Sequence, residues 1–213
     1  MGSREAIAEF WDRIAKQPQH EITMASIEQA LRGINLYLIG MMGSGKTTIG
    51  KLLAERIGYR FFDTDATIES VAGQSIPEIF AESGESGFRD LESQVLAELS
   101  AYGHLAIATG GGIVLRRTNW SRLHYGLTVW LDVPVEQLYQ RLQSESENRP
   151  LLQTADPQGR LQELLEQRRS LYAQADLRIA VKADETPVQV VDKILATIPS
   201  VLKPTPTPTG DRN

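Results

Sequence analysis

The residues best suited to chemistry follow one another from position 40 to 47, in the order Gly-Met-Met-Gly-Ser-Gly-Lys-Thr. This run fits the pattern G-x-x-x-x-G-K-[ST], whose glycines let the backbone wrap a polyphosphate so that its N–H groups face the negative charge. Lys46 would reach the β- and γ-phosphates of a nucleotide, and the Thr47 hydroxyl would bind Mg²⁺. The alternative interpretation is a glycine turn without function.

The sequence on either side of this run favours phosphate binding. Residues 34–39 predict a buried strand, and residues 46–57 predict an amphipathic helix that ends at Gly58. A loop between a strand and a helix sets the helix N-terminus, with its unpaired N–H groups, against bound phosphates.

Two carboxylates, Asp63 and Asp65, follow the next predicted strand, residues 60–62. They would lie at the rim of the site, where one could act on Mg²⁺ through water while the other orients a hydroxyl and accepts its proton. The alternative is that an Asp here caps the helix predicted at 64–71, because Asp is a favoured N-cap residue.

Three consecutive glycines, 110–112, follow the strand predicted at 104–108. Glycines expose backbone N–H groups and allow a ligand to approach closely, although a plain turn is the alternative. Many phosphate-loop enzymes place a magnesium-binding Asp at this strand end. No carboxylate stands here, which leaves Asp63 as the better candidate for the metal.

Four arginines could bind an anionic acceptor and the phosphoryl group in transfer: Arg89, Arg149, Arg168 and Arg169. The alternative for each is an ordinary surface charge. From the residues alone, the chain is a small-molecule kinase with an anionic acceptor that the sequence does not name.

Short apolar segments alternate with amphipathic ones, which is typical of an α/β fold whose parallel sheet is covered by helices on both faces. Such sheets bind ligands at the carboxyl ends of their strands, where the glycine loops and the two aspartates stand. Further strands are predicted at 127–131 and 178–181, and further helices at 76–82, 85–101, 117–124, 134–143, 159–174 and 187–197.

Three parts are expected along the chain. Residues 1–32 form an N-terminal extension, with a helix at about 4–17 that either packs on the domain or binds a partner. Residues 33–198 form the domain, within which the polar segment 144–159 suits a mobile lid. Residues 199–213, rich in Pro and Thr, are expected to be an extended, disordered tail.

Composition excludes several other classes of protein. The net charge of −5 argues against a nucleic-acid-binding surface, and the absence of cysteine excludes disulfides and thiol catalysis. The three histidines lack zinc-ligand spacing, and no apolar stretch approaches the roughly 20 residues that span a bilayer. The N-terminus resembles neither a signal nor a transit peptide. We therefore expect a soluble cytoplasmic protein.

From about residue 33 to 198 the chain resembles the shikimate kinase family. The phosphate loop is followed in order by Phe-Phe-Asp-Thr-Asp at 61–65, Gly-Glu-x-x-Phe-Arg-x-x-Glu at 84–92, and Thr-Gly-Gly-Gly at 109–112. Arg-Pro-Leu-Leu at 149–152 and Arg-x-x-x-Tyr at 168–172 come next. The loop alone is widespread, whereas the full set distinguishes this family from gluconate and nucleoside monophosphate kinases. The segment 168–172 lacks a proline that family members often carry, and its spacing to Tyr172 favours Arg168 over Arg169.

The resemblance implies a three-layer P-loop kinase fold of the nucleoside monophosphate kinase type, with a five-stranded parallel sheet and a monomeric state. It implies that ATP phosphorylates the 3-hydroxyl of shikimate, on the route to chorismate and aromatic amino acids. It also implies roles for residues. The phosphates would be bound by Gly43, Ser44, Gly45, Lys46, Thr47 and Thr48, with Arg149 closing from the lid. Mg²⁺ would be bound by Thr47 and Asp63. Shikimate would be bound by Asp65, Arg89, Gly111 and Arg168, and Asp65 would position and help to deprotonate the attacking hydroxyl.

Two alternatives stay open at this point. One is a related kinase with another acceptor, and the other is a phosphate-loop protein that binds or regulates without catalysis.

Overall fold

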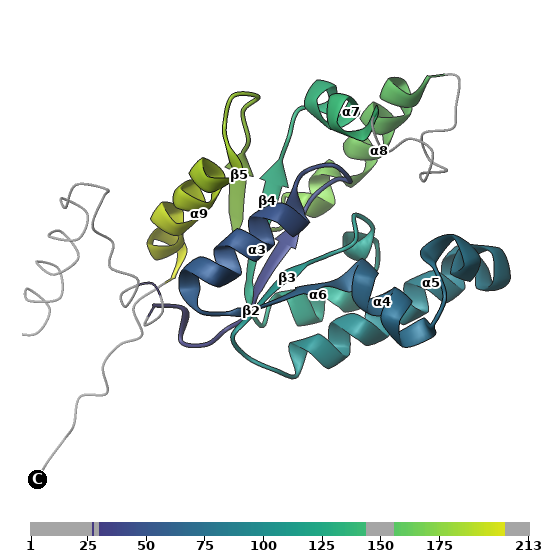
Figure 1. Ribbon diagram of the computed structural model, residues 1–213, viewed down its shortest axis with the longest axis horizontal. Coiled ribbons are helices and arrows are strands. Elements are labelled where there is room, and N and C mark those ends of the chain that lie inside the picture. The colour runs from purple at the N-terminus through teal and green to yellow at the C-terminus, as the bar shows by residue number, and fades with distance from the viewer. Residues whose placement is uncertain (1–26, 28–29, 144–155, 203–213) are drawn as a thin grey trace, which may run out of the picture.

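The computed structural model describes residue 27, residues 30–143 and residues 156–202 (Figure 1). The helix predicted at about 4–17, nearly all of the predicted lid and the tail from residue 203 lie outside the described residues.

Five strands form one sheet in the order β2-β3-β1-β4-β5, and every neighbouring pair is parallel. All five predicted strands are therefore present, with small differences in their ends. The central strands β1 and β3 are buried at every residue, as expected for a parallel sheet covered on both faces. The bounds are β1 Leu36–Ile39, β2 Arg60–Asp63, β3 Leu105–Ala108, β4 Leu127–Asp132 and β5 Leu177–Ala180.

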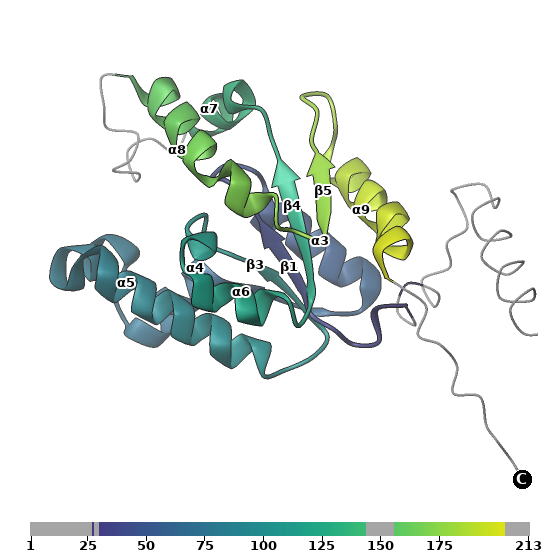
Figure 2. The same cartoon turned by 180° about the vertical axis from the view of Figure 1, so that it is seen from behind.

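Helices cover both faces of this sheet, which confirms the three-layer α/β class. Helices α3 and α9 lie on one face (Figure 1), and α5, α6 and α8 lie on the other (Figure 2). The bounds are α3 Lys46–Ile57, α4 Thr64–Ala72, α5 Ile76–Ser100, α6 Arg117–Leu123, α7 Val135–Gln143, α8 Pro157–Tyr172 and α9 Pro187–Val201, with a short 3-10 turn, η1, at Ile113–Leu115.

Two helices predicted at 76–82 and 85–101 appear as the two parts of α5. Gly84 interrupts the helical backbone between them, with φ 65° and ψ −173°. Positive φ is accessible to glycine at little cost, so this residue allows the chain to turn between the two parts. Arg89 lies near the start of the second part of α5.

The predicted domain limits at both ends need correction. Ile27 and Leu31, which the sequence assigned to an extension, are buried in the core at 1% and 0% exposure. Residues 199–201, which it assigned to a disordered tail, complete α9, where Pro199 occupies the last turn. A proline this near a helix end removes only one intrahelical hydrogen bond, and apolar Ile198 anchors the turn in the core.

Side chains from both helical layers enclose the sheet in one apolar core. Gly50 of α3 brings that helix close to the sheet, because a Cβ there would lie 2.6 Å from Phe61 and 2.9 Å from Leu38. In the described residues, no helix is both long and apolar enough to cross a bilayer. The packing leaves the loops at the carboxyl ends of β1, β2 and β3 side by side.

Candidate active site

The loop between β1 and α3 has the backbone that its glycines allow. Gly40, Gly43 and Gly45 have φ values of 143°, 75° and 90°, a region that other residues rarely adopt. Gly45 is the N-cap of α3 and makes no side-chain cap, so no side chain of its own covers the first N–H groups of the helix. This geometry leaves a helix N-terminus available to an anion.

Lys46 lies across this loop. Its side chain is only 9% exposed, and Nζ donates to the carbonyls of Gly40 at 3.0 Å and Met41 at 2.8 Å. A longer contact of 3.4 Å joins Nζ to the Ser44 hydroxyl. The ammonium group is thereby held within the loop, where a phosphate chain would meet it.

Asp63, the last residue of β2, contacts both the first turn of α3 and the start of α4. Its Oδ2 accepts a hydrogen bond from the Thr47 hydroxyl at 2.7 Å, while Oδ1 accepts from the backbone N–H groups of Asp65 and Ala66. The carboxylate therefore caps α4 and also lies against the predicted metal-binding hydroxyl.

The oxygen donors of Thr47 and Asp63 suit Mg²⁺, a hard cation that takes a few protein oxygens and completes its shell with phosphate and water. No group of three or more acidic or histidine side chains gathers anywhere in the described part of the chain. A two-oxygen protein site of this kind fits a metal that arrives with a nucleotide.

Asp65 lies against the triple-glycine loop at the end of β3. A Cβ on Gly110 would come within 2.7 Å of both Asp65 Oδ1 and Glu92 Oε1, so only glycine allows this approach. The Gly110 N–H donates to the Thr64 hydroxyl at 2.8 Å, which fixes the loop to the start of α4. The predicted base is thus positioned where a close ligand could reach it.

Arg89 and Glu92 form a buried ion pair beside this loop. Their side chains are 13% and 0% exposed, and Arg89 Nη1 lies 2.8 Å from Glu92 Oε2. Burial raises the pKa of Glu92, an effect that the neighbouring Arg89 charge partly opposes. A Cβ on Gly112 would overlap the Arg89 guanidinium, so the cation packs directly against the glycine backbone.

Each residue of this ion pair has a polar atom that makes no hydrogen bond within the described part of the chain. Arg89 Nε and Glu92 Oε1 are both buried and have no hydrogen-bond partner among the described residues. Buried polar atoms without partners are rare and often mark a place where a ligand or water completes the network.

Arg168 reaches the same loop from the other side. It is 9% exposed, and Nη1 donates to the Gly111 carbonyl at 3.2 Å. Its neighbour Arg169 is instead paired with Glu166 at 3.1 Å, with 42% of its side chain exposed. The geometry of the two arginines agrees with the Tyr172 spacing that favoured Arg168.

Asp65, Arg89, Gly111 and Arg168, the predicted acceptor-binding set, are therefore brought together by the fold, as are Lys46, Thr47 and Asp63. Arg149 and the lid segment 144–155 lie outside the described residues.

Sequence reasoning assigned no role to three residues that contact this site. Glu92 pairs with Arg89, Tyr172 donates to the Gly111 carbonyl at 2.6 Å, and Arg141 donates to the Gly43 carbonyl at 3.2 Å. The helical spacings from Arg89 to Glu92 and from Arg168 to Tyr172 were available as signals, because such spacings place side chains on one face. Nothing in the sequence singles out Arg141.

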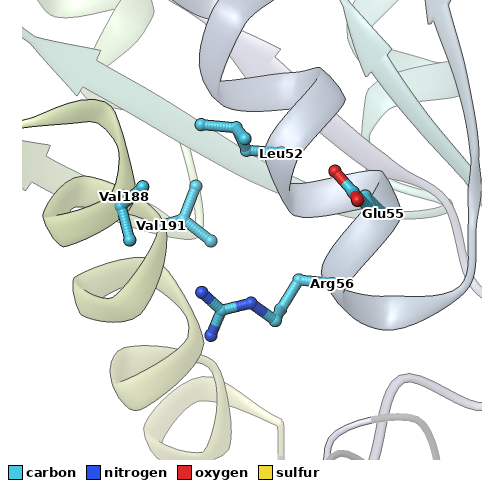
Figure 3. Close-up of a pocket in the computed structure, with 5 residues that line it drawn as sticks. All are labelled: Leu52, Glu55, Arg56, Val188 and Val191. Carbon is cyan, nitrogen blue, oxygen red and sulfur yellow. The ribbon is translucent and has the colours of Figure 1, made fainter.

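Two cavities lie apart from this cluster. One, of about 380 Å³, opens between α3 and α9 (Figure 3) and is lined by Leu52, Glu55, Arg56, Val188 and Val191. The other, of about 570 Å³, lies at the ends of β4 and β5 and includes Arg169 among its lining residues. Neither is lined by the residues that the fold brings together, which are Lys46, Thr47, Asp63, Asp65, Arg89, Gly111 and Arg168.

The sheet order, the phosphate loop at the end of β1 and the carboxylates at the end of β2 define a P-loop phosphotransferase. A protein-family model described as shikimate kinase matches residues 42–199. The chain belongs to the shikimate kinase family, whose members are ATP-dependent phosphotransferases.

Individual relatives agree with this assignment. The chain is 63% identical over 175 residues to shikimate kinase of Trichormus variabilis, covering 82% of this chain and 96% of the relative. It is 60% identical over 178 residues to that of Synechococcus elongatus, covering 84% and 93%. Among solved structures, shikimate kinase from Acinetobacter baumannii in complex with shikimate is similar with a TM-score of 0.75 at 40% identity, covering 82% of this chain and 97% of that one.

Proposed function

We propose that this chain transfers the γ-phosphoryl group of ATP to the 3-hydroxyl of shikimate. The products would be shikimate 3-phosphate and ADP, in the pathway to chorismate and aromatic amino acids. The observation that carries the proposal is the convergence of two largely buried arginines, Arg89 and Arg168, on one glycine loop beside Asp65. Such a cluster suits a small ring that carries both a carboxylate and hydroxyl groups.

On the donor side, the backbone from Gly43 to Thr48 would bind the phosphates of ATP, and Lys46 would turn from its carbonyl partners to the β- and γ-phosphates. Thr47 and Asp63 would hold Mg²⁺, which neutralises charge on the phosphates when bound. The 2.7 Å contact between these two side chains supports that assignment.

On the acceptor side, Arg89 and Arg168 would bind the shikimate carboxylate, since guanidinium groups match carboxylate geometry. Asp65 would accept a hydrogen bond from the attacking hydroxyl and take its proton as the bond to phosphorus forms. Glu92, buried behind Arg89, would keep the guanidinium oriented while it binds the carboxylate. Because shikimate would lie close to the Gly111 backbone, substrates larger than shikimate would be excluded.

We further propose that segment 144–159 closes over the site and brings Arg149 to the phosphates. Closure would exclude water, which otherwise competes as phosphoryl acceptor.

An assay of ADP release with shikimate, gluconate and nucleoside monophosphates as separate acceptors tests the function. We expect Mg²⁺-dependent turnover with shikimate and none above background with the others. Turnover on gluconate without turnover on shikimate would contradict the proposal. ATP binding without turnover on any acceptor would indicate a non-catalytic protein instead.

The cytoplasmic location and the monomeric state also belong to this proposal. Light scattering after size-exclusion chromatography should give the mass of one chain, and a dimer mass would contradict the monomeric state.

A further inference from the structure

Tyr172, the last residue of α8, is buried beside the acceptor site. Its side chain is 0% exposed, and its hydroxyl donates to the Gly111 carbonyl at 2.6 Å. The same oxygen lies 3.6 Å from the sulfur of Met41 in the phosphate loop. One phenol therefore contacts both glycine loops of the candidate site.

The Gly111 carbonyl accepts two hydrogen bonds from one face of α8. Arg168 Nη1 donates at 3.2 Å, and the Tyr172 hydroxyl donates at the shorter distance of 2.6 Å. A carbonyl oxygen has two lone pairs and can accept both. Residues four apart on a helix project from the same face, so α8 delivers the two donors together.

Arg168 and Tyr172 would cease to share the Gly111 carbonyl when the substrate to be phosphorylated binds. If Arg168 turns to a carboxylate, the Gly111 carbonyl loses one hydrogen bond in a partly buried place, where an unpaired acceptor is unfavourable. The Tyr172 hydroxyl makes the shorter of the two hydrogen bonds to this carbonyl. It would keep the carbonyl paired and the glycine loop in position while the guanidinium moves.

We propose that Tyr172 is a positioning residue for the acceptor: by holding the Gly111 carbonyl, it allows Arg168 to bind the substrate carboxylate. This inference rests on the proposed function, because it takes the acceptor to be carboxylated. Tyr172 would therefore influence affinity for shikimate and leave the affinity for ATP unchanged.

The surroundings of the phenol suit a permanent donor. Burial raises the pKa of Tyr172 to about 12, so the hydroxyl keeps its proton at any physiological pH. The ring stacks on Trp130 with centroids 5.8 Å apart, and that contact fixes its orientation.

A second buried tyrosine provides a matched control. Tyr37 is also 0% exposed, and its hydroxyl donates to the Ser100 hydroxyl at 3.0 Å, with no contact to the candidate site. Tyr172→Phe and Tyr37→Phe each remove one buried hydroxyl, so they share any general cost to folding.

The test measures shikimate binding by titration calorimetry and KM for both substrates in the two variants. We expect Tyr172→Phe to weaken shikimate binding and raise its KM roughly fivefold to tenfold, with KM for ATP within about twofold of wild type. Tyr37→Phe should leave both constants near wild type.

A double variant sharpens the test. If Tyr172 acts through Arg168, then adding Tyr172→Phe to Arg168→Lys should weaken shikimate binding by less than about twofold beyond the single Arg168→Lys change. The positioning role would be overturned if Tyr172→Phe and Tyr37→Phe changed shikimate binding equally, or if the effects of Tyr172→Phe and Arg168→Lys were fully additive. Either result would leave the proposed function standing. Failure of the wild-type protein to bind shikimate would overturn the proposed function and this inference with it.

Discussion

The phosphate loop is held mainly by its own neighbours in the chain, with one distant hydrogen bond from Arg141 to the Gly43 carbonyl, whereas the acceptor side is assembled from distant segments. Lys46 bonds to carbonyls five and six residues before it. In contrast, Arg168 and Tyr172 bond to a carbonyl 57 and 61 residues away, and the Gly110 N–H bonds to a hydroxyl 46 residues away. The donor side is thus a local structure, and the acceptor side exists only when α4, α5 and α8 are packed correctly.

This difference indicates how the two halves should respond to change. Substitutions in the loop should affect the chemistry of ATP and leave the fold intact. Substitutions on the acceptor side should affect substrate affinity and stability together, because the same buried groups serve both.

Lys46→Ala should reduce kcat about 10³-fold, because it removes a cation from the phosphates in the transition state. Thermal unfolding should change little, since the loop backbone is set by its glycines. Lys51→Ala, an exposed lysine of the same helix, is the matched control and should retain turnover in the ADP-release assay. Comparable losses in both variants would show that the effect is not specific to the loop.

Glu92→Ala should lower the free energy of unfolding by about 3 kcal/mol, because it leaves the largely buried charge of Arg89 without its buried partner. Glu98→Ala on the exposed side of α5 should change it by less than about 0.5 kcal/mol. Denaturant unfolding monitored by circular dichroism measures both. Equal stability of the two variants would mean that the buried pair does not support the acceptor side.

The Glu92 effect should depend on pH. Burial raises its pKa above the ordinary 4.5, so the folded protein holds this proton more tightly than the unfolded chain does. The contribution of Glu92 to stability is then complete below pH 4.5 and declines as the pH rises through the pKa of the folded state. The difference in the free energy of unfolding between wild type and Glu92→Ala should therefore become smaller as the pH rises through this range. A difference that widens would contradict the direction of the pKa shift.

Gly112→Ala should raise KM for shikimate about tenfold while KM for ATP stays within twofold. The backbone there has φ −98°, which alanine adopts without strain, so the added Cβ acts by displacing the Arg89 guanidinium. Steady-state kinetics with each substrate varied in turn measures the split. An equal rise in the KM values for shikimate and ATP would contradict the idea that the acceptor side and the phosphate loop act separately.

Asp63 lies where the halves meet, and two substitutions separate its roles. Asp63→Asn keeps an N-cap for α4 and should retain stability while the requirement for Mg²⁺ rises. Asp63→Ala should lose about 1 kcal/mol of stability in addition. Magnesium titration of turnover and thermal unfolding measure the two effects. If neither variant changed the Mg²⁺ requirement, Asp63 would serve only as the N-cap of α4 and its role in binding Mg²⁺ would be contradicted.

The contrast between local and assembled structure also explains what the sequence could predict. The phosphate loop and all five strands were predictable, because glycine spacing and apolar runs are local signals. That Asp63 both caps α4 and contacts Thr47 was not predictable, since the sequence offered the cap and the metal ligand as alternatives and the 2.7 Å contact is seen only in the fold. Glu92 and Tyr172 received no role, because their partners are identified by packing.

The domain limits failed for a related physical reason. Ile27 and Leu31 are ordinary apolar residues in a stretch without a strong pattern, so the sequence does not mark them as part of the core in which they are buried. Residues 199–213 were expected to be a disordered tail, whereas residues 199–201 continue α9 and apolar Ile198 packs this last turn into the core.

Titration calorimetry of Arg89→Ala with shikimate and, separately, with ATP tests the central claim most directly. Arg56→Ala, which breaks an exposed ion pair with Asp192, is the matched control. We predict that Arg89→Ala weakens shikimate binding by at least about tenfold and changes ATP binding by less than about twofold. Equal losses for the two ligands, or a larger loss for ATP, would contradict an acceptor side that is built separately from the phosphate loop.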